Sequence, residues 1–177
     1  MKTPEYEVMY RVEEGHWWYR ALRRVLFANL DRYLPEWHDR PLLDAGCGTG
    51  ANLIRLGQTP HTVGIDFSKD ALTFCRQRGL ARLARADVAA LPFADQTFAG
   101  VVSTHVLYHQ WVPEVARPLA EFRRVLADGG LLFLELPAYA SLYSTHDDAV
   151  MTARRFTAAQ VRHDVESAGF RVLRLTY

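Results

Sequence analysis

The sequence is poor in cysteine, has no excess of charge of either sign and lacks a long apolar run. Its only cysteines, Cys47 and Cys75, have no Cys or His partner at the spacing of metal ligands. No secretory signal and no apolar stretch of about 18 residues occurs. We therefore expect a protein without a metal site, without an integral membrane segment and in a reduced, cytoplasmic setting.

The charge balance narrows the class of partner. Lysine and arginine number 21 against 20 aspartates and glutamates, so the molecule as a whole does not attract polyanions. We expect no nucleic acid among its partners. Of the 177 residues 49% are hydrophobic, which suits a single domain that buries roughly two thirds of its unfolded surface.

The pattern of apolar residues changes near Pro41. Residues 18–33 carry apolar side chains at helical spacing, with arginines between them, until Pro35 stops the pattern. Short apolar runs then alternate with helical patterns. The runs that predict strands are residues 41–45, 61–65, 82–86, 98–104 and 131–136, with a last strand-like run at 170–177.

Helices are expected between these strands. Ser68 and Gly79 suit the beginning and end of one, residues 112–126 carry a second apolar face, and residues 157–160 have the form of a capping box. This alternation implies a mostly parallel sheet with helices on both faces, the doubly wound α/β arrangement of Rossmann-like folds. We divide the single domain 1–177 into an N-terminal helical cap (1–40), a core (41–136), a loop (137–156) and a last helix and strand (157–177).

The first segment that carries chemistry is 44–50, which reads Asp-Ala-Gly-Cys-Gly-Thr-Gly between an apolar strand and a helix beginning near residue 51. Glycine at alternate positions permits a tight turn and close approach of the backbone to a ligand. Dinucleotide-binding proteins use a similar turn with the spacing Gly-x-Gly-x-x-Gly, and here the third glycine comes one residue earlier. The segment alone indicates an adenosine-containing ligand.

Two carboxylates follow the next strands. Asp66 ends the second strand, 20 residues beyond Gly46, where a carboxylate accepts both ribose hydroxyls of NAD or of S-adenosylmethionine (SAM). Asp87 follows the third strand, where an acceptor would meet the adenine amino group. The early third glycine and Asp87 together favour SAM.

In these segments, and in 101–109 and 124–130, the chain resembles the class I SAM-dependent methyltransferases, particularly the ubiquinone-biosynthesis-like small-molecule group. The resemblance covers nearly the whole chain through five ordered segments. The cofactor-binding residues that it implies are Asp44, Gly46, Cys47, Gly48 and Gly50 in the loop, Asp66 at the ribose, Phe67 at the adenine face, Asp87 and the Val88 backbone at the adenine edge, and Ser103 and His105 at the methionine end.

Residues 14–20, Glu-Gly-His-Trp-Trp-Tyr-Arg, also resemble a lid segment of a bacterial branch of this family. The resemblance implies aromatic rings that exclude water, with Tyr19 or Arg20 reaching the SAM carboxylate. The chain departs from the family at 99–100 and Tyr108, where an acidic residue is common. The family's sheet adds an antiparallel seventh strand after the sixth, and since the sequence stops at Tyr177 we expect this strand to be missing.

Three histidines are candidates for handling a methyl acceptor. His105 and His109 are four residues apart, so on a helix they would share a face beside the methyl group, and histidine is the usual general base near neutral pH. His146, next to Asp147, lies in the 137–156 loop, which we interpret as either substrate-binding or disordered. The alternative for His105 and His109 is a packing role, and Cys47 is expected to pack rather than react.

The combined hypothesis is a methyltransferase that moves the SAM methyl group to a small-molecule or lipid-like acceptor by in-line displacement, leaving S-adenosylhomocysteine (SAH). Two alternatives stay open. One is an NAD(P)-dependent oxidoreductase, and the other is a SAM- or SAH-binding protein, or a fragment, without turnover. The acceptor and the oligomeric state do not follow from the sequence.

Overall fold

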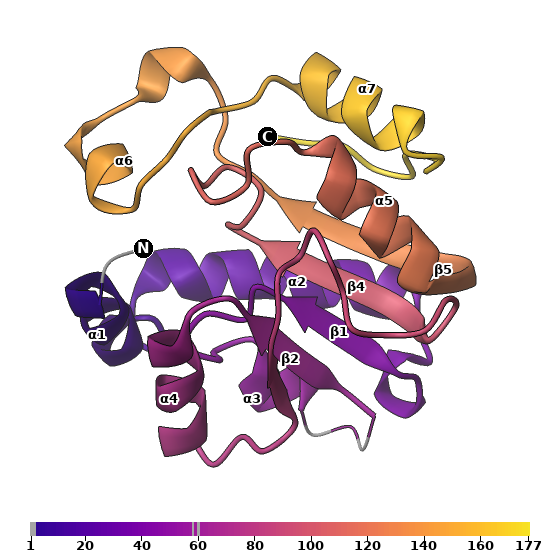
Figure 1. Ribbon diagram of the computed structural model, residues 1–177, viewed down its shortest axis with the longest axis horizontal. Helices are drawn as coiled ribbons and strands as arrows, with labels where there is room; N and C mark the ends of the chain where they lie inside the picture. Colours follow the sequence, from indigo (N-terminus) through magenta and orange to yellow (C-terminus); the bar gives the residue numbers. More distant parts are fainter. Residues whose placement is uncertain (1–2, 58, 60) are drawn as a thin grey trace.

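The computed structural model describes residues 3–57, 59 and 61–177 (Figure 1). Its helices are α1 (Thr3–Val12), α2 (Trp17–Tyr33), α3 (Leu53–Leu56), α4 (Lys69–Gln77), α5 (Ala116–Val125), α6 (Thr145–Ala149) and α7 (Ala158–Ser167), with 3-10 turns η1 (Trp37–Asp39) and η2 (Ala140–Leu142). Its strands are β1 (Leu42–Ala45), β2 (Val63–Asp66), β3 (Leu83–Arg85), β4 (Phe98–Thr104) and β5 (Leu126–Glu135).

Within the described ranges the strands form one parallel sheet in the order β3-β2-β1-β4-β5. The central strand β1 pairs on one side with β2 and on the other with β4, so that Asp44 lies opposite both Gly64 and Val102. Parallel neighbours need long crossovers, and the helices between the strands supply them. The predicted parallel α/β sheet is therefore confirmed.

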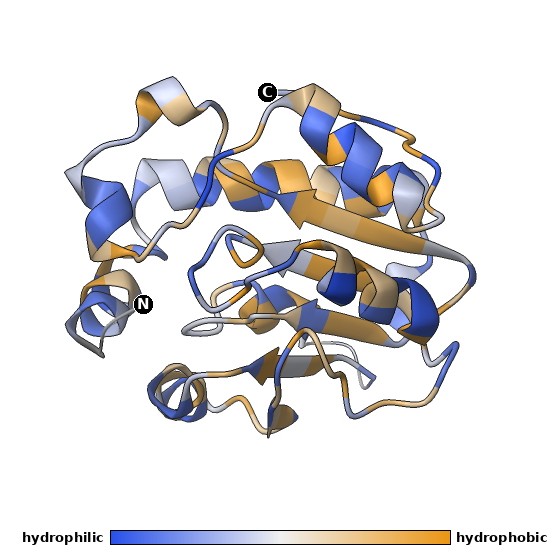
Figure 2. Cartoon of the chain, turned by 45° about the horizontal axis from the view of Figure 1, so that its top comes forward, coloured by the Kyte–Doolittle hydropathy of each residue, from blue (hydrophilic) through white to orange (hydrophobic). Residues whose placement is uncertain are grey.

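Helices cover both faces of this sheet, because successive strand residues point in opposite directions. Leu43 and Val101 belong to a core shared with α5 and α7, whereas Leu42 and Val102 belong to a core shared with α2, α3 and α4. Figure 2 shows the strands mainly in hydrophobic colours, while the helices carry both kinds of residue. The sheet is thus buried on both faces, as its continuous apolar runs predict.

Helix α2 confirms the helix expected at 18–33. His16 caps its beginning by accepting a hydrogen bond from the Trp18 amide (3.3 Å), and its buried face carries Leu26, Phe27 and Leu30. Figure 1 shows that α1, which precedes it, lies beside α4. No helix among the described residues is both long and apolar enough to cross a bilayer.

The strand expected at 170–177 is wrong. The tail has no strand pairing, and instead Tyr177 stacks on Tyr139 (4.7 Å between ring centroids) and accepts a hydrogen bond from the Ala158 amide (2.9 Å). An alternating pattern becomes a strand only beside a hydrogen-bonding neighbour. Here the tail runs to the beginning of α7 instead of along β5.

The junction of α5 and β5 also differs from the prediction. The helix ends at Val125, and β5 begins at once at Leu126 instead of at residue 131. The pairing of β5 with β4 changes register between Phe98, which lies opposite Leu126, and Gly100, which lies opposite Leu131. The residues of β5 within this shift include Gly129, whose φ is +74°. The expected turn is therefore an irregular section inside the strand.

Trp37 provides a test of the core beneath α2. It is fully buried, donates from its indole nitrogen to Asp31 (2.8 Å) and packs against Phe27. Trp37→Ala should lower the free energy of unfolding by about 3–5 kcal/mol in urea titrations, since it empties a large packed volume. Trp17→Ala, at a site 70% exposed, should change it by less than about 0.5 kcal/mol. Equal losses in the two variants would contradict the packing described.

Candidate functional site

The glycine loop after β1 turns back over the end of β2. The amides of Gly46 and Cys47 both donate to the Ile65 carbonyl (2.8 Å each), and the Gly48 amide donates to the Asp66 carboxylate (2.9 Å). Gly46 and Gly48 have φ values of +87° and +55°, which favour glycine. A Cβ on Gly46 would lie 2.2 Å from a Val106 methyl group, so the loop depends on its missing side chain.

Asp66 and Asp87 extend the site along the ends of β2 and β3. The other oxygen of Asp66 accepts from the Ser68 amide (2.8 Å); burial raises the pKa of Asp66, and its two backbone hydrogen bonds oppose the rise. Asp87 is exposed and accepts from the Ala89 amide (2.8 Å). Each carboxylate keeps lone pairs for further donors.

A cavity of about 510 Å³ lies along the carboxyl ends of the strands. It brings together most of the residues predicted from the sequence. Those that line it are Tyr19, Gly46, Cys47, Gly48, Asp66, Phe67, Asp87, Val88, His105 and His109. Residues far apart in the chain therefore meet at one edge of the sheet.

Five predicted residues lie outside the cavity lining. Gly50 packs against Leu80 and Cys75, Ser103 donates to the Ala45 carbonyl (2.9 Å) inside the sheet, and Asp44 is fully buried behind the loop. Arg20 lines a different depression, and His146 is exposed on α6. The partner expected for His146 is engaged elsewhere, since Asp147 pairs with Arg155 through two hydrogen bonds of 2.9 Å.

That ion pair also orders the 137–156 loop. Asp147 is 2% exposed, and the hydrogen bonds from Arg155 lower the pKa of its carboxyl to about 2. The loop further contacts the site through a bridge between His109 and Thr152. The loop therefore touches one residue of the cavity lining, and its substrate-binding role stays a prediction.

His105 and His109 line the cavity but do not share a helix. His105 follows β4 with φ +58°, a strained value for a residue with a side chain. Its Nε2 lies 3.9 Å from an oxygen of Glu135, at the end of β5. Burial lowers the pKa of both histidines to about 4 and raises that of Glu135 to about 7, so both imidazoles are neutral at pH 7.

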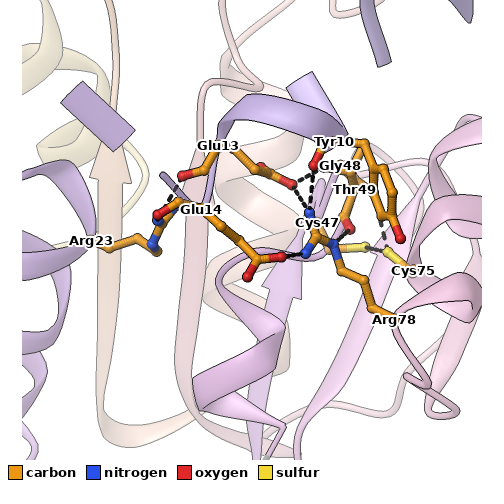
Figure 3. A network of polar contacts seen from close by, with 9 residues as sticks. All are labelled: Tyr10, Glu13, Glu14, Arg23, Cys47, Gly48, Thr49, Cys75 and Arg78. Carbon is orange, nitrogen blue, oxygen red and sulfur yellow. Dashed lines mark hydrogen bonds and ion pairs between the residues drawn. The ribbon is translucent and has the colours of Figure 1, made fainter. Parts of the chain in front are cut away.

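A buried ion pair fixes the N-terminal segment over the glycine loop (Figure 3). Arg78 donates to Glu13 (2.8 Å), to the Thr49 carbonyl (2.9 Å) and to the Tyr10 carbonyl (3.1 Å), and it also pairs with Glu14. Glu13 in turn accepts from the Thr49 hydroxyl. No local pattern reveals this network, because its members are brought together only by the fold.

The cavity's cover differs from the lid expected at 14–20. Tyr6 and Met9 from α1 and Tyr19 and Arg23 from α2 line the cavity. The two tryptophans of that segment do not line it and are exposed. Sequence reasoning missed Glu13, Arg23, Arg78 and Glu135, which lie outside the motifs that carried it.

These residues fit an adenosine cofactor. Gly46 and Gly48 line the cavity with backbone alone, and Asp66 and Asp87 supply acceptors at its margin. The fold and this cavity define the class, a Rossmann-like α/β protein with a cofactor site where the connections of β1 and β4 diverge. The chain belongs to the family described as methyltransferase domain, whose model matches residues 42–130, and its cofactor is SAM.

Known proteins agree with this assignment. A malonyl-[acyl-carrier protein] O-methyltransferase of Geobacter sulfurreducens is 38% identical over 149 residues, which cover 73% of this chain and 55% of that protein. A SAM-dependent methyltransferase of Mesorhizobium loti superposes with a TM-score of 0.67 at 20% identity, covering 90% of this chain and 83% of that one. The [4+2]-cyclase SpnF gives 0.66 at 26% identity, covering 87% and 60%. The chain spans about half the length of the curated relatives it matches.

The close contact at Gly46 can be tested by adding a methyl group there. Gly46→Ala should weaken SAH binding by more than about tenfold in calorimetry, because the new methyl group collides with Val106. Gly79→Ala is the matched control, since Gly79 also has a positive φ (+77°) but no atom within 4 Å of the added Cβ. Equal SAH affinity in both variants would contradict the close approach at Gly46.

Both carboxylate oxygens of Asp44 are buried without a hydrogen-bond partner among the described residues. Burial raises its pKa to about 8. The folded state therefore holds this proton more tightly than the unfolded state, and the resulting stability is lost as the pH rises from about 4 to about 8.

Asp44→Asn should remove this loss. The melting temperature of the variant relative to the parent should rise between pH 5 and pH 8.5 by on the order of 5 °C. Thermal unfolding of both proteins across that range measures the difference. Parallel profiles would show that Asp44 does not titrate in this window.

Proposed function

We propose that the chain binds SAM along the cavity and transfers its methyl group to a small-molecule or lipid-like acceptor. The observation that carries the proposal is one continuous cavity that joins the Asp66 and Asp87 carboxylates to His105 and His109. In this assignment the loop glycines and Cys47 lie under the cofactor and Asp66 holds the ribose. Phe67 covers the adenine, and Asp87 and the Val88 amide bind its edge.

At the methionine end we assign Tyr19 and Arg23, in place of Arg20, to the cofactor carboxylate. Arg23 lines the cavity and its guanidinium is held by the Glu13 carbonyl (2.7 Å). Guanidinium groups bind carboxylates with two parallel hydrogen bonds. In this assignment the N-terminal segment binds the cofactor, as the resemblance to the bacterial lid segment implies, and both α1 and α2 cover the site.

When bound, SAM supplies a methyl group already activated by its sulfonium. The chain's own residues then have to align the acceptor and exclude water from the cavity. His105 and His109 are the candidate bases if the acceptor is a hydroxyl, and burial makes each a weaker base than a free imidazole. Glu135, with an oxygen 3.9 Å from His105 Nε2, is a further titratable group beside that imidazole.

Support for the acceptor class comes from the lining and from the relatives. Aromatic and apolar side chains such as Leu22, Trp111 and Val112 line the same cavity as the histidines. The Geobacter relative is named for methylation of a malonyl group on a carrier protein, which agrees with an organic acceptor. These features suit the ubiquinone-biosynthesis-like group that the sequence resembles.

The alternative cofactor is a dinucleotide such as NADH, and the position of Asp66 suits the ribose of either cofactor. We expect SAH, but not NADH, to give saturable heat on titration. Asp66→Asn should weaken SAH binding by about 2 kcal/mol or more, because the ribose loses charged acceptors. Asp128→Asn, at a side chain 82% exposed, is the control.

The same titrations separate methyl transfer from binding alone. Transfer of radiolabel from SAM to a panel of hydroxyl and amine acceptors, absent in Asp66→Asn, supports the proposed activity. Tight SAH binding without transfer to any acceptor would favour the non-catalytic alternative, which matters because a neighbour of this fold is a cyclase. NADH binding at the expense of SAH would overturn the cofactor assignment.

A further inference from the structure

A second depression, of about 320 Å³, lies between α2 and α3 and is rich in arginine. Arg20, Arg23 and Arg24 reach it from α2, and Arg55 reaches it from α3. Such a density of positive charge is local, because the whole chain has a formal net charge of +1. We call these four residues the arginine cluster.

The acids next to the arginine cluster, Glu13 and Glu14, are both paired with Arg78. Glu14 is the one acid that lines the depression in the described part of the chain, and its carboxylate is held by Arg78, as Figure 3 shows. Across residues 3–57, 59 and 61–177, no ion pair involves any member of the cluster.

The contacts that the cluster does make leave most of its donors free. Arg23 donates to the Glu13 carbonyl, and the Arg55 guanidinium lies 4.1 Å from the centroid of the Phe27 ring. Burial lowers the pKa of Arg23, the Glu13 carboxylate opposes this shift, and the neighbouring charge of Arg20 adds to it. Positive charges held this close repel one another, and a bound anion relieves the repulsion.

The depression adjoins the cofactor cavity. Arg23 and Ala51 line both, and Ala51 lies directly after the glycine loop. Phe27 and Ile54 give the depression an apolar part, which suits a ligand with carbon as well as charge. A ligand bound here would reach toward the cofactor past the methionine end.

We propose that the arginine cluster binds a phosphate group carried by the methyl acceptor. The inference rests on the proposed function and names the acceptor's chemical class, an organic phosphate. Guanidinium groups bind phosphate oxygens through paired hydrogen bonds. Four guanidinium groups offer more donors than the two oxygens of one carboxylate would use. Trp17 lies on the same helix face as Arg20 and Arg24 and is 70% exposed, so a phospholipid headgroup is one source of this phosphate.

Calorimetry with pyrophosphate tests the site without requiring the acceptor. The parent protein should bind pyrophosphate saturably and more weakly at high salt. Arg20→Gln with Arg24→Gln should weaken that binding by about tenfold or more, because two of the four guanidinium groups are removed. SAH affinity should stay unchanged in this variant.

Arg32→Gln is the matched control, because Arg32 lies on the same helix but over the Tyr33 ring, outside the depression. It should bind pyrophosphate like the parent. No saturable binding, an equal loss in Arg32→Gln, or loss of SAH affinity in the double variant would each overturn the proposal. Failure of the parent to bind SAH would instead overturn the proposed function.

Vesicles then distinguish the sources of the phosphate. Sedimentation with phosphatidylcholine vesicles, with and without phosphatidylglycerol, is compared for the parent and the double variant. Pyrophosphate binding with cluster-dependent binding to the anionic vesicles supports a phospholipid acceptor. Pyrophosphate binding without vesicle binding supports a dissolved organic phosphate.

Discussion

The position of β1 in the middle of a parallel sheet is the constraint on which the site depends. The chain leaves β1 toward the face covered by α3 and leaves β4 toward the face covered by α5. The two connections diverge, and ligands of open α/β sheets bind where such connections separate. The same parallel order brings Gly46, Asp66, Asp87, His105 and Glu135 to one edge, although they span 90 residues of sequence.

A buried charge pair connects the N-terminal helices to this edge. Glu13 is 5% exposed, and burial raises its pKa while Arg78 and the Thr49 hydroxyl oppose the rise. Breaking a buried pair costs more than forming it gains, since the remaining charge stays without a partner. Arg78 also binds a carbonyl of the glycine loop, so the cover and the loop are held by the same side chain.

The sequence predicted what depends on neighbouring residues. Apolar runs and cap residues located five strands and helix α2, and glycine spacing located the loop. Contacts between distant segments escaped it, as at Arg78 and Arg23, which have no motif of their own. Local patterns also misled where the fold competes with them: residues 170–177 form a strand-like apolar run but have no strand pairing, and His105 takes φ +58° instead of a helical value.

The cofactor cavity and the second depression differ in the charges of the residues that line them. The cofactor cavity is lined by four acidic side chains, Glu13, Asp66, Asp87 and Glu135, and by three basic ones, Arg23, Lys69 and Arg85. The lining of the second depression has four arginines against one acid, Glu14, and that acid is held by Arg78. The arginine cluster adjoins the cavity at Arg23 and Ala51. An anionic group on the acceptor would therefore be favoured beside the arginine cluster over the cofactor cavity, and this preference would orient the acceptor along the site.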